Sequence, residues 1–488
     1  MDKLDHRCDA LGKCVAPVGR LKTLKWILLV GLLVRLPGLF GTLWYDETFT
    51  LWLAGLSLPD LLAATAGDVH PPLWYIVEWL TVRALGNSEW ALRLPALILG
   101  LLAVWLMYGV LSRIQGIPDP VRTLALWFTA LSPMLVHYSA EARMYSLFAV
   151  MVLWSMDNAL AGRYIWLGVS MALGMYTHNM FALYVPVFVF TAASKTPVIY
   201  PLSSIGIAGA LYLPWLPTLL HQAQNVNSAY WIPPLNFGRI SYIVYRLING
   251  PGHHEYIVLI TAPLLLTAAL TGSYLAWKSA HLPTRSPAHL LLWAWFPIIL
   301  GAVISHVIAP VLIERVVIGS APALLTLIAW SGWWVYQHLG RWYLLPITGA
   351  LAIGLFTVMT TTIRDDVLGR YQQLPVQAGD SCYHLNASTL ITTRYALPQC
   401  NHSIWPSENA LDQSITQQTK TAMGMAQQPI EALSGLVWLF HYTGPHVQGL
   451  EYAEQRRILS AHPARATFLL DNDRNIAVTQ VWRLELQQ

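Results

Sequence analysis

Residues Thr42–Gly55 read TLWYDETFTLWLAG and follow an apolar segment, Trp26–Phe40, whose main interruption is Arg35. Two adjacent carboxylates, Asp46 and Glu47, stand just after this segment, among aromatic residues. A basic stretch precedes the segment and no small-residue cleavage site follows it, so we predict a membrane anchor and not a cleaved signal peptide. The acidic pair is therefore expected where the chain first leaves the bilayer.

The composition is that of a membrane protein. The chain has 488 residues, of which 55% are hydrophobic and 11% are charged, and its mean hydropathy is +0.46. Soluble domains carry about 25% charged residues, and several apolar windows here approach the roughly 20 residues that cross a bilayer. The net charge of +4 is small for this length and indicates no nucleic-acid partner. We therefore predict a multi-pass protein of the plasma (inner) membrane.

The distribution of lysine and arginine predicts the orientation of the chain. The basic tail, residues 1–25, is expected in the cytoplasm, which places the acidic pair on the far side. The segment His70–Gly86 contains a glutamate and an arginine, and its apolar run of roughly 15 residues is short for a crossing. Its aromatic and charged residues suit a helix that lies in the membrane interface. We therefore predict one external loop, residues 44–90, with interfacial helices.

The transmembrane domain, residues 26–363, is expected to be all-α with about 11 spans. Its other external loops are residues 138–145 and 217–255, and an odd number of spans also places residues 364–488 outside. The predicted spans after the first anchor are Ala91–Leu111, Val121–His137, Met144–Leu160, Tyr164–Tyr176, Phe181–Ala193, Val198–Trp215, Tyr256–Trp277, Leu290–Ile308, Val316–Tyr336 and Trp342–Ile363.

The polar C-terminal part, residues 364–488, contains short mixed segments such as ATFLLDN and IAVTQVWRLEL that are typical of strands. It is long enough for a core of its own, so we predict a small extracytoplasmic α/β domain. Cys382 and Cys400 lie in this domain and could form a disulfide in an oxidising compartment. The alternative is that these two, Cys8 and Cys14 are four unrelated free cysteines.

Two motifs far apart in the sequence reach the same membrane boundary in this topology: Asp46-Glu47, and Glu141 followed by Arg143. A carboxylate there can take a proton from a hydroxyl group, and an arginine can bind a phosphate through paired hydrogen bonds. With an apolar wall, these groups predict transfer from a lipid phosphate to an alcohol. For Trp44 and Tyr45, stacking on a sugar and membership of an interfacial aromatic belt are equally favoured.

Several motifs resemble those of one known superfamily. WYDETFT, HPPLWY, GNSEWALRLPAL, SPMLVHYSAEARMYSL and MYTHNMFAL are similar, in this order, to motifs of the GT-C membrane glycosyltransferases. The resemblance is greatest to the protein mannosyltransferase and aminoarabinose transferase group (glycosyltransferase family 39-like), in a bacterial subgroup similar to rhizobial lipopolysaccharide-core transferases. It covers about Ile27–Ala193 well and PVLIERVVIGSAPALL more loosely.

The resemblance implies roles for particular residues. The acid of the first external loop, Asp46 with Glu47 beside it, is expected to be the catalytic base, and the acid of the second loop corresponds to Glu141. Many relatives carry aspartate at this second position. Arg315 is expected at the lipid phosphate. The full set predicted to bind substrate is Trp44, Tyr45, His70, Arg143, Tyr145, His178 and Arg315, although a histidine after a span, such as His178, is also a common polar end-cap.

The resemblance further implies an inverting glycosyltransferase with a polyprenyl-phosphate sugar donor and a glycan, lipid or protein acceptor. A divalent cation is an open expectation, since Asp46, Glu47, His70 and Glu141 are suitable ligands without a fixed spacing. One alternative is a lipid-linked oligosaccharide ligase or a phosphate-group transferase. Another is a transporter of a lipid or solute, although transporters tend to place ionisable groups near the bilayer midplane.

Overall fold

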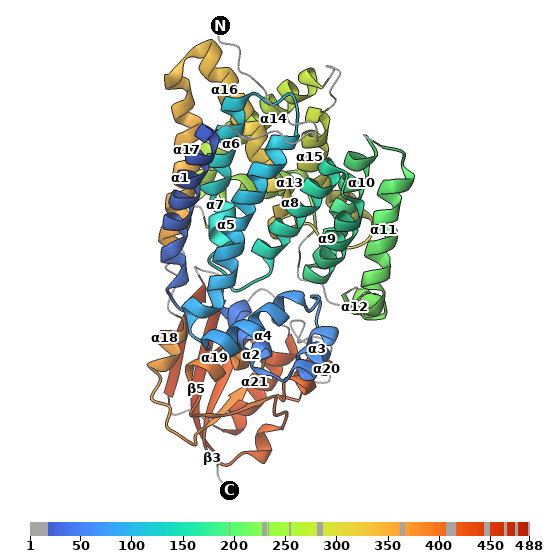
Figure 1. The fold of residues 1–488 in the computed structure, drawn as a ribbon. Coiled ribbons are helices and arrows are strands. Elements are labelled where there is room, and N and C mark those ends of the chain that lie inside the picture. Colours follow the sequence, from blue (N-terminus) through green and yellow to red (C-terminus); the bar gives the residue numbers. More distant parts are fainter. Residues whose placement is uncertain are drawn as a thin grey trace.

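The computed structural model of the chain describes residues 18–194, 196–226, 232, 234–252, 255–280, 286–361, 367–406, 416–443, 449–462, 466–473 and 477–486. A helical bundle makes up most of it, and a smaller domain with a five-stranded sheet lies at one end of the bundle (Figure 1). The predicted fold class is confirmed. Cys8, Cys14 and most of the predicted basic tail lie outside the described residues.

Each predicted span corresponds to a helical segment of the bundle. The predicted external loop 217–255 differs, because its helix α13 (Phe237–Asn249) packs against bundle helices. Within the described residues, five helices are long and apolar enough to cross a membrane, and three shorter apolar helices accompany them. The chain is thus a multi-pass membrane protein, while the number of crossings and the orientation stay predictions. The bundle helices are α1 (Val18–Arg35), α5 (Glu89–Arg113), α6 (Asp119–Ala130), α7 (Pro133–Tyr138), α8 (Tyr145–Ala161), α9 (Tyr164–Thr177), α10 (Val185–Ala193), α11 (Ile199–Tyr212), α13 (Phe237–Asn249), α14 (Glu255–Ser279), α15 (Ser286–Val307), α16 (Ala321–Leu339) and α17 (Leu345–Thr361).

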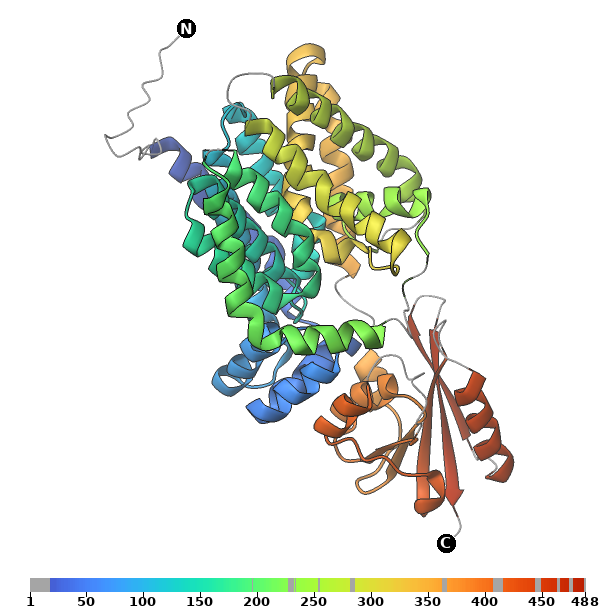
Figure 2. The same cartoon turned by 90° about the vertical axis from the view of Figure 1, so that its right-hand side faces the viewer.

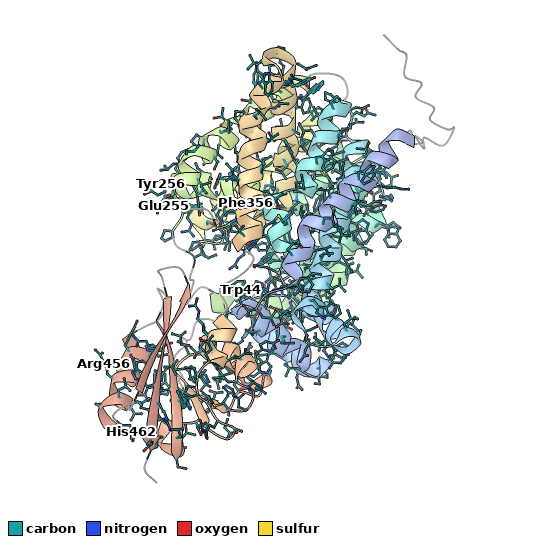
Figure 3. The ribbon with its side chains drawn as sticks, turned by 90° about the vertical axis from the view of Figure 1, so that its left-hand side faces the viewer. Trp44, Glu255, Tyr256, Phe356, Arg456 and His462 are labelled. Atoms are coloured by element: carbon teal, nitrogen blue, oxygen red, sulfur yellow. A yellow bond between two sulfur atoms is a disulfide. The ribbon has the colours of Figure 1, made fainter. Side chains whose placement is uncertain are left out.

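The bundle shows the apolar surface that lipid contact requires. Trp26, Trp105 and Phe356 expose more than half of their surface (Figure 3 labels Phe356), which would be unfavourable in water. Helix α16 is instead buried along its first three turns.

Arg35, the charged residue that interrupts the first apolar segment, forms hydrogen bonds at a break between two helices. The break lies between α6 and α7, where Pro133 has no N–H to donate. The Arg35 guanidinium donates to the carbonyl oxygens of Ala130 (2.7 Å) and Gly31 (2.8 Å) and to the Ser139 hydroxyl (3.1 Å). The Ala130 carbonyl at the break therefore has a buried partner.

The loop that is predicted to be the first external one, residues 44–90, forms three helices, α2 (Tyr45–Gly55), α3 (Leu58–Gly67) and α4 (Leu73–Leu85). They lie across the end of the bundle, between the bundle and the C-terminal domain, together with α12 (Leu216–Val226) (Figures 1 and 2). Arg83 of α4 donates to the carbonyl oxygens of Ala54 and Leu56, each at 2.9 Å. This position agrees with the prediction that His70–Gly86 does not cross the membrane.

The C-terminal domain is a mixed sheet with the strand order β2-β1-β3-β5-β4. β1 pairs in parallel with β2 and β3, while β5 is antiparallel to β3 and β4. The α/β domain predicted from the sequence is thereby confirmed. Its elements are α18 (Val367–Gln372), β1 (Ser381–His384), α19 (Ala387–Ala396), β2 (Asn401–Ile404), α20 (Gln417–Ala422), β3 (Gly435–Thr443), α21 (Gly449–Ala461), β4 (Ala466–Asp473) and β5 (Ala477–Leu486).

The core of this domain continues into the first external loop. Leu51 of α2 and Val82 of α4 pack against a buried cluster that contains Leu397 and Cys400 of the C-terminal domain. The Arg394 guanidinium also lies 4.2 Å from the ring centre of Trp52 in α2. The C-terminal domain is therefore packed directly against the loop that carries the acidic pair.

Cys382 and Cys400 form a disulfide, with their Cα atoms 5.9 Å apart. This agrees with the first of the two predicted alternatives for these residues. The bond closes a loop with a sequence separation of 18 residues, from β1 to the start of β2.

Replacing both residues, Cys382→Ala with Cys400→Ala, should lower the free energy of unfolding by about 3 kcal/mol, because the unfolded chain loses a cross-link. Thermal unfolding of the purified protein in detergent measures the effect. Reduction of the wild-type protein should lower its unfolding temperature to that of the variant. An unfolding temperature unaffected by reduction would contradict this expectation.

Candidate active site

The two adjacent carboxylates at the start of α2 lie in different surroundings. Glu47 is fully buried and forms two parallel hydrogen bonds with Arg93 of α5, each 2.8 Å long. Arg93 also donates to the carbonyl oxygens of Gly41 (3.0 Å) and Thr42 (2.9 Å). A buried, two-pronged ion pair of this kind has fixed geometry, so Glu47 is held in place.

Asp46 is held much more loosely. Its Oδ2 atom lies 3.7 Å from Nε of Arg143 and 3.8 Å from Nη1 of Arg315, beyond hydrogen-bond length. Its side chain keeps 18% of its surface exposed. Asp46 therefore faces two guanidinium groups and can still reach a ligand.

The first external loop also fixes the second one through Ala142. The Ala142 amide donates to Glu47 Oε1 (3.0 Å), and its carbonyl accepts from the indole N–H of Trp74 (3.0 Å). The neighbouring Arg143 donates to the Tyr75 hydroxyl at 3.2 Å. The two loops thus meet in one place, as the topology predicted, and the backbone around Ala142 joins them.

Glu141, which precedes Ala142 in the sequence, is buried. Its Oε1 atom lies 3.2 Å from Nε2 of His137. The ring of Tyr145, at the start of α8, lies 5.8 Å from the Arg315 guanidinium and 6.4 Å from the His178 ring. Glu141 and Tyr145 therefore lie in the neighbourhood of Asp46, without a direct contact to it among the described residues.

Glu314 and Arg315 have different partners. Glu314 is adjacent to Arg315 in the sequence, but its carboxylate pairs with Arg246 of α13 at 3.2 Å. Because Arg246 neutralises Glu314, the positive charge of Arg315 faces Asp46.

His70 and His178 face each other, with ring centres 5.2 Å apart. Nδ1 of His178 accepts from the Met180 amide at 3.1 Å, so this histidine also caps the turn after α9. Burial, with the nearby charge of Arg143, lowers the pKa of His70 well below its ordinary value. His70 is therefore neutral near pH 7 and can donate or accept a hydrogen bond.

Asp68 is a residue of the site that sequence reasoning did not single out. It is 8% exposed, and the backbone N–H groups of Val69 and His70 donate to its carboxylate. Its Oδ2 atom has no hydrogen-bond partner within the described part of the chain. Burial raises the pKa of Asp68 to about 6, although the charge of Arg143 opposes this shift. The signal in the sequence was an acid two residues before His70, in DVHPP.

Trp44 lies just before α2 and Tyr45 is the first residue of this helix; both are half-buried, and Figure 3 labels Trp44. The Trp44 amide donates to Glu47 Oε2 at 3.3 Å, and Tyr45 packs against the hydrophobic core. Neither contact decides between the two predicted roles, so both remain open.

The donor set does not favour the divalent cation that the sequence left open. Glu47 uses both of its carboxylate oxygens on Arg93, and Asp46 faces two positive charges. Among the described residues, the only close group of three suitable ligands is Cys382, Cys400 and His402, and its two cysteines form a disulfide. We therefore assign no step to a cation.

Comparisons with known proteins agree with this arrangement. Residues 69–219 match the family described as dolichyl-phosphate-mannose-protein mannosyltransferase, while a search of curated proteins finds no match. The structure is similar to that of ArnT from Cupriavidus metallidurans in the apo state, at 13% sequence identity and a TM-score of 0.59. That alignment covers 95% of this chain and 98% of ArnT. The chain has the GT-C fold.

Two further structures are similar to this GT-C chain. ArnT from Cupriavidus metallidurans bound to undecaprenyl phosphate gives 13% identity and a TM-score of 0.59, over 96% of this chain and 98% of ArnT. The apo oligosaccharyltransferase from Archaeoglobus fulgidus gives 10% identity and a TM-score of 0.50, over 86% of this chain and 69% of that chain. These likenesses confirm the fold that the motifs predicted.

Substituting Arg93→Met should lower the free energy of unfolding of this GT-C protein by about 3–5 kcal/mol, because Glu47 would become an unpaired buried charge. Thermal unfolding in detergent measures the loss. Asp119→Asn is the control: it breaks an ion pair in which Asp119 is 55% exposed, and should change the free energy by about 1 kcal/mol or less. Equal effects of the two substitutions would contradict the assignment.

Asp68→Asn should stabilise the protein at pH 7.5 and not near pH 4. Because the pKa of Asp68 is raised from 3.8 to about 6, the unfolded chain loses this proton first, and stability falls as the pH rises through the folded-state pKa. The gain at pH 7.5 should be on the order of 1–3 kcal/mol. Thermal unfolding at both pH values tests this, and an equal effect at both would contradict it.

Proposed function

We propose that the protein is an inverting glycosyltransferase that moves a sugar from a polyprenyl-phosphate donor to an acceptor hydroxyl group. The observation that carries this proposal is the loosely held carboxylate of Asp46 between Arg143 and Arg315. A reactive carboxylate beside two guanidinium groups suits a reaction in which a hydroxyl loses its proton while a phosphate leaves.

Arg143 and Arg315 would bind the donor phosphate. Arg143 is 4% exposed, and its Nε atom has no hydrogen-bond partner in the described parts of the chain. A partly desolvated guanidinium group binds phosphate more strongly than a fully hydrated one. With the phosphate on these two arginines, the anomeric carbon of the sugar would lie toward Asp46.

Asp46 would act as the general base. As it takes the proton of the acceptor hydroxyl, the acceptor oxygen forms a bond to the anomeric carbon, and the bond from this carbon to the phosphate oxygen breaks. The polyprenyl phosphate leaves with that electron pair. A single displacement inverts the configuration, as in reactions where a carboxylate activates the attacking oxygen directly.

The other residues of the site have supporting roles in this proposal. Glu47 is a positioning residue and not a base, since Arg93 holds both of its oxygens. Asp68, through its Oδ2 atom, and Glu141 would accept hydrogen bonds from hydroxyl groups of the sugar or the acceptor. Neutral His70 and His178, with Tyr145, would line the sugar pocket.

The comparisons support the class of donor. The family that matches residues 69–219 is described by a dolichyl-phosphate-linked sugar, and the ArnT structure that this chain resembles holds undecaprenyl phosphate. We extend this to a polyprenyl-phosphate sugar here, with a glycan, lipid or protein acceptor. The positive-inside rule supports a site that faces away from the cytoplasm.

Transfer can be tested with membranes that contain the protein and radiolabelled polyprenyl-phosphate sugars. Asp46→Asn should bind the donor but lower the rate of transfer at least 100-fold, because the base is lost. The control is Asp60→Asn, in an exposed acid of the same external loop, which should keep full activity. Robust transfer by Asp46→Asn would remove Asp46 from this role.

The product of the same assay separates the alternatives. A single labelled sugar on a new product supports the glycosyltransferase, while a whole oligosaccharide would support a ligase. Movement of intact donor across the membrane without a new product would support a transporter.

A further inference from the structure

The C-terminal end of α3 receives hydrogen bonds from the C-terminal domain. In α20, the Thr419 hydroxyl donates to the Ala64 carbonyl (2.9 Å), and the Thr416 hydroxyl, just before this helix, donates to the Gly67 carbonyl (2.7 Å). The last carbonyl groups of a helix have no partner within it. The Ala64 carbonyl also accepts from the Asp68 amide at 3.1 Å. The two threonine hydroxyls, roughly 350 residues later in the chain, add further hydrogen bonds to this helix end.

The same segment is held from two more directions. Gln222 of α12 donates to the Thr65 carbonyl at 2.9 Å, and Asn179 donates to the Val69 carbonyl at 3.0 Å. Residues 64–69 are therefore fixed by three elements that are distant in the sequence. If these carbonyl groups needed only a hydrogen-bond donor, water at the membrane surface could supply it.

Gly67 allows α20 to come this close. A Cβ atom at this position would lie 2.7 Å from the Thr419 hydroxyl oxygen and 2.9 Å from that of Thr416. The next residue is Asp68, which ends α3 in an extended conformation, and His70 follows shortly after. The position of α20 thus sets where the chain leaves α3, and with it the place of both side chains.

We propose that α20 of the C-terminal domain is a positioning element of the active site, acting through the turn that carries Asp68 and His70. This inference rests on the proposed function, and it makes the domain part of the machinery for transfer and not only a docking module. Thr416 and Thr419 touch neither substrate in this proposal. They keep the Asp68 carboxylate beside Arg143, where small displacements are costly for a reaction that depends on orientation.

Thr419→Val tests the proposal with little change of shape. Thr419 is the better choice of the two, because the Thr416 hydroxyl also caps the N-terminus of α20. The variant should lower kcat about tenfold or more while KM for the donor changes less than threefold. Thr419→Ser, which keeps the hydroxyl, should restore kcat. The control is Thr421→Val, an exposed position on the same helix whose hydroxyl bonds only within α20 among the described contacts.

A second measurement does not depend on catalysis. Asp68→Asn is made in the wild type and in Thr419→Val, and the shift of the unfolding temperature at pH 7.5 is compared. If α20 sets the surroundings of Asp68, the shift should change at least twofold in the Thr419→Val background and stay the same in Thr421→Val.

The outcomes separate this proposal from the proposed function. An inactive wild type with intact coupling between Thr419 and Asp68 would count against the glycosyltransferase and support the positioning role. An active wild type in which Thr419→Val behaves like Thr421→Val, in kcat and in coupling, would overturn the positioning role. A loss of kcat that Thr419→Ser does not restore would also overturn it, because the hydroxyl would not be the cause.

Discussion

The buried ion pair of Glu47 with Arg93 is the interaction on which the rest of the site depends. It joins the first turn of α2 to α5, and through Arg93 it fixes the backbone at Gly41 and Thr42. The same carboxylate accepts the amide of Ala142, so one buried charge sets the distance between the two external loops. Asp46 directly precedes Glu47 in the sequence, so this arrangement also determines its position.

The neighbouring carboxylates of Glu47 and Asp46 therefore have different tasks. One is held by short, paired hydrogen bonds in a dry environment, where it is suited to structure. The other is partly exposed and faces its cations at a longer distance, where a substrate can come between them. Neither residue type nor spacing distinguishes these tasks, since both acids carry the same charge at the same helix end. The difference arises because the Arg93 side chain forms its hydrogen bonds with Glu47.

Much of the fold was predictable from the sequence, because apolar length and the placement of charges fix helices in a bilayer. The proximity of Asp46 to Arg143 followed from the same rules, while the interfacial position of His70–Gly86 stays a prediction. Asp68 was not predictable, since the turn after α3 buries it and leaves its Oδ2 atom without a hydrogen-bond partner among the described residues. The strand order of the C-terminal domain was also hidden, because short strands with mixed patterns do not specify their neighbours.

The separation of α3 from α20 along the chain has a consequence for biogenesis. Protein domains emerge from the ribosome in order, at roughly 5–20 residues per second. The bundle and Asp46 are synthesised first, but the hydroxyl groups that complete the end of α3 belong to residues 416 and 419. A nascent chain thus lacks these partners, and the site acquires these contacts only after residue 419 has been made.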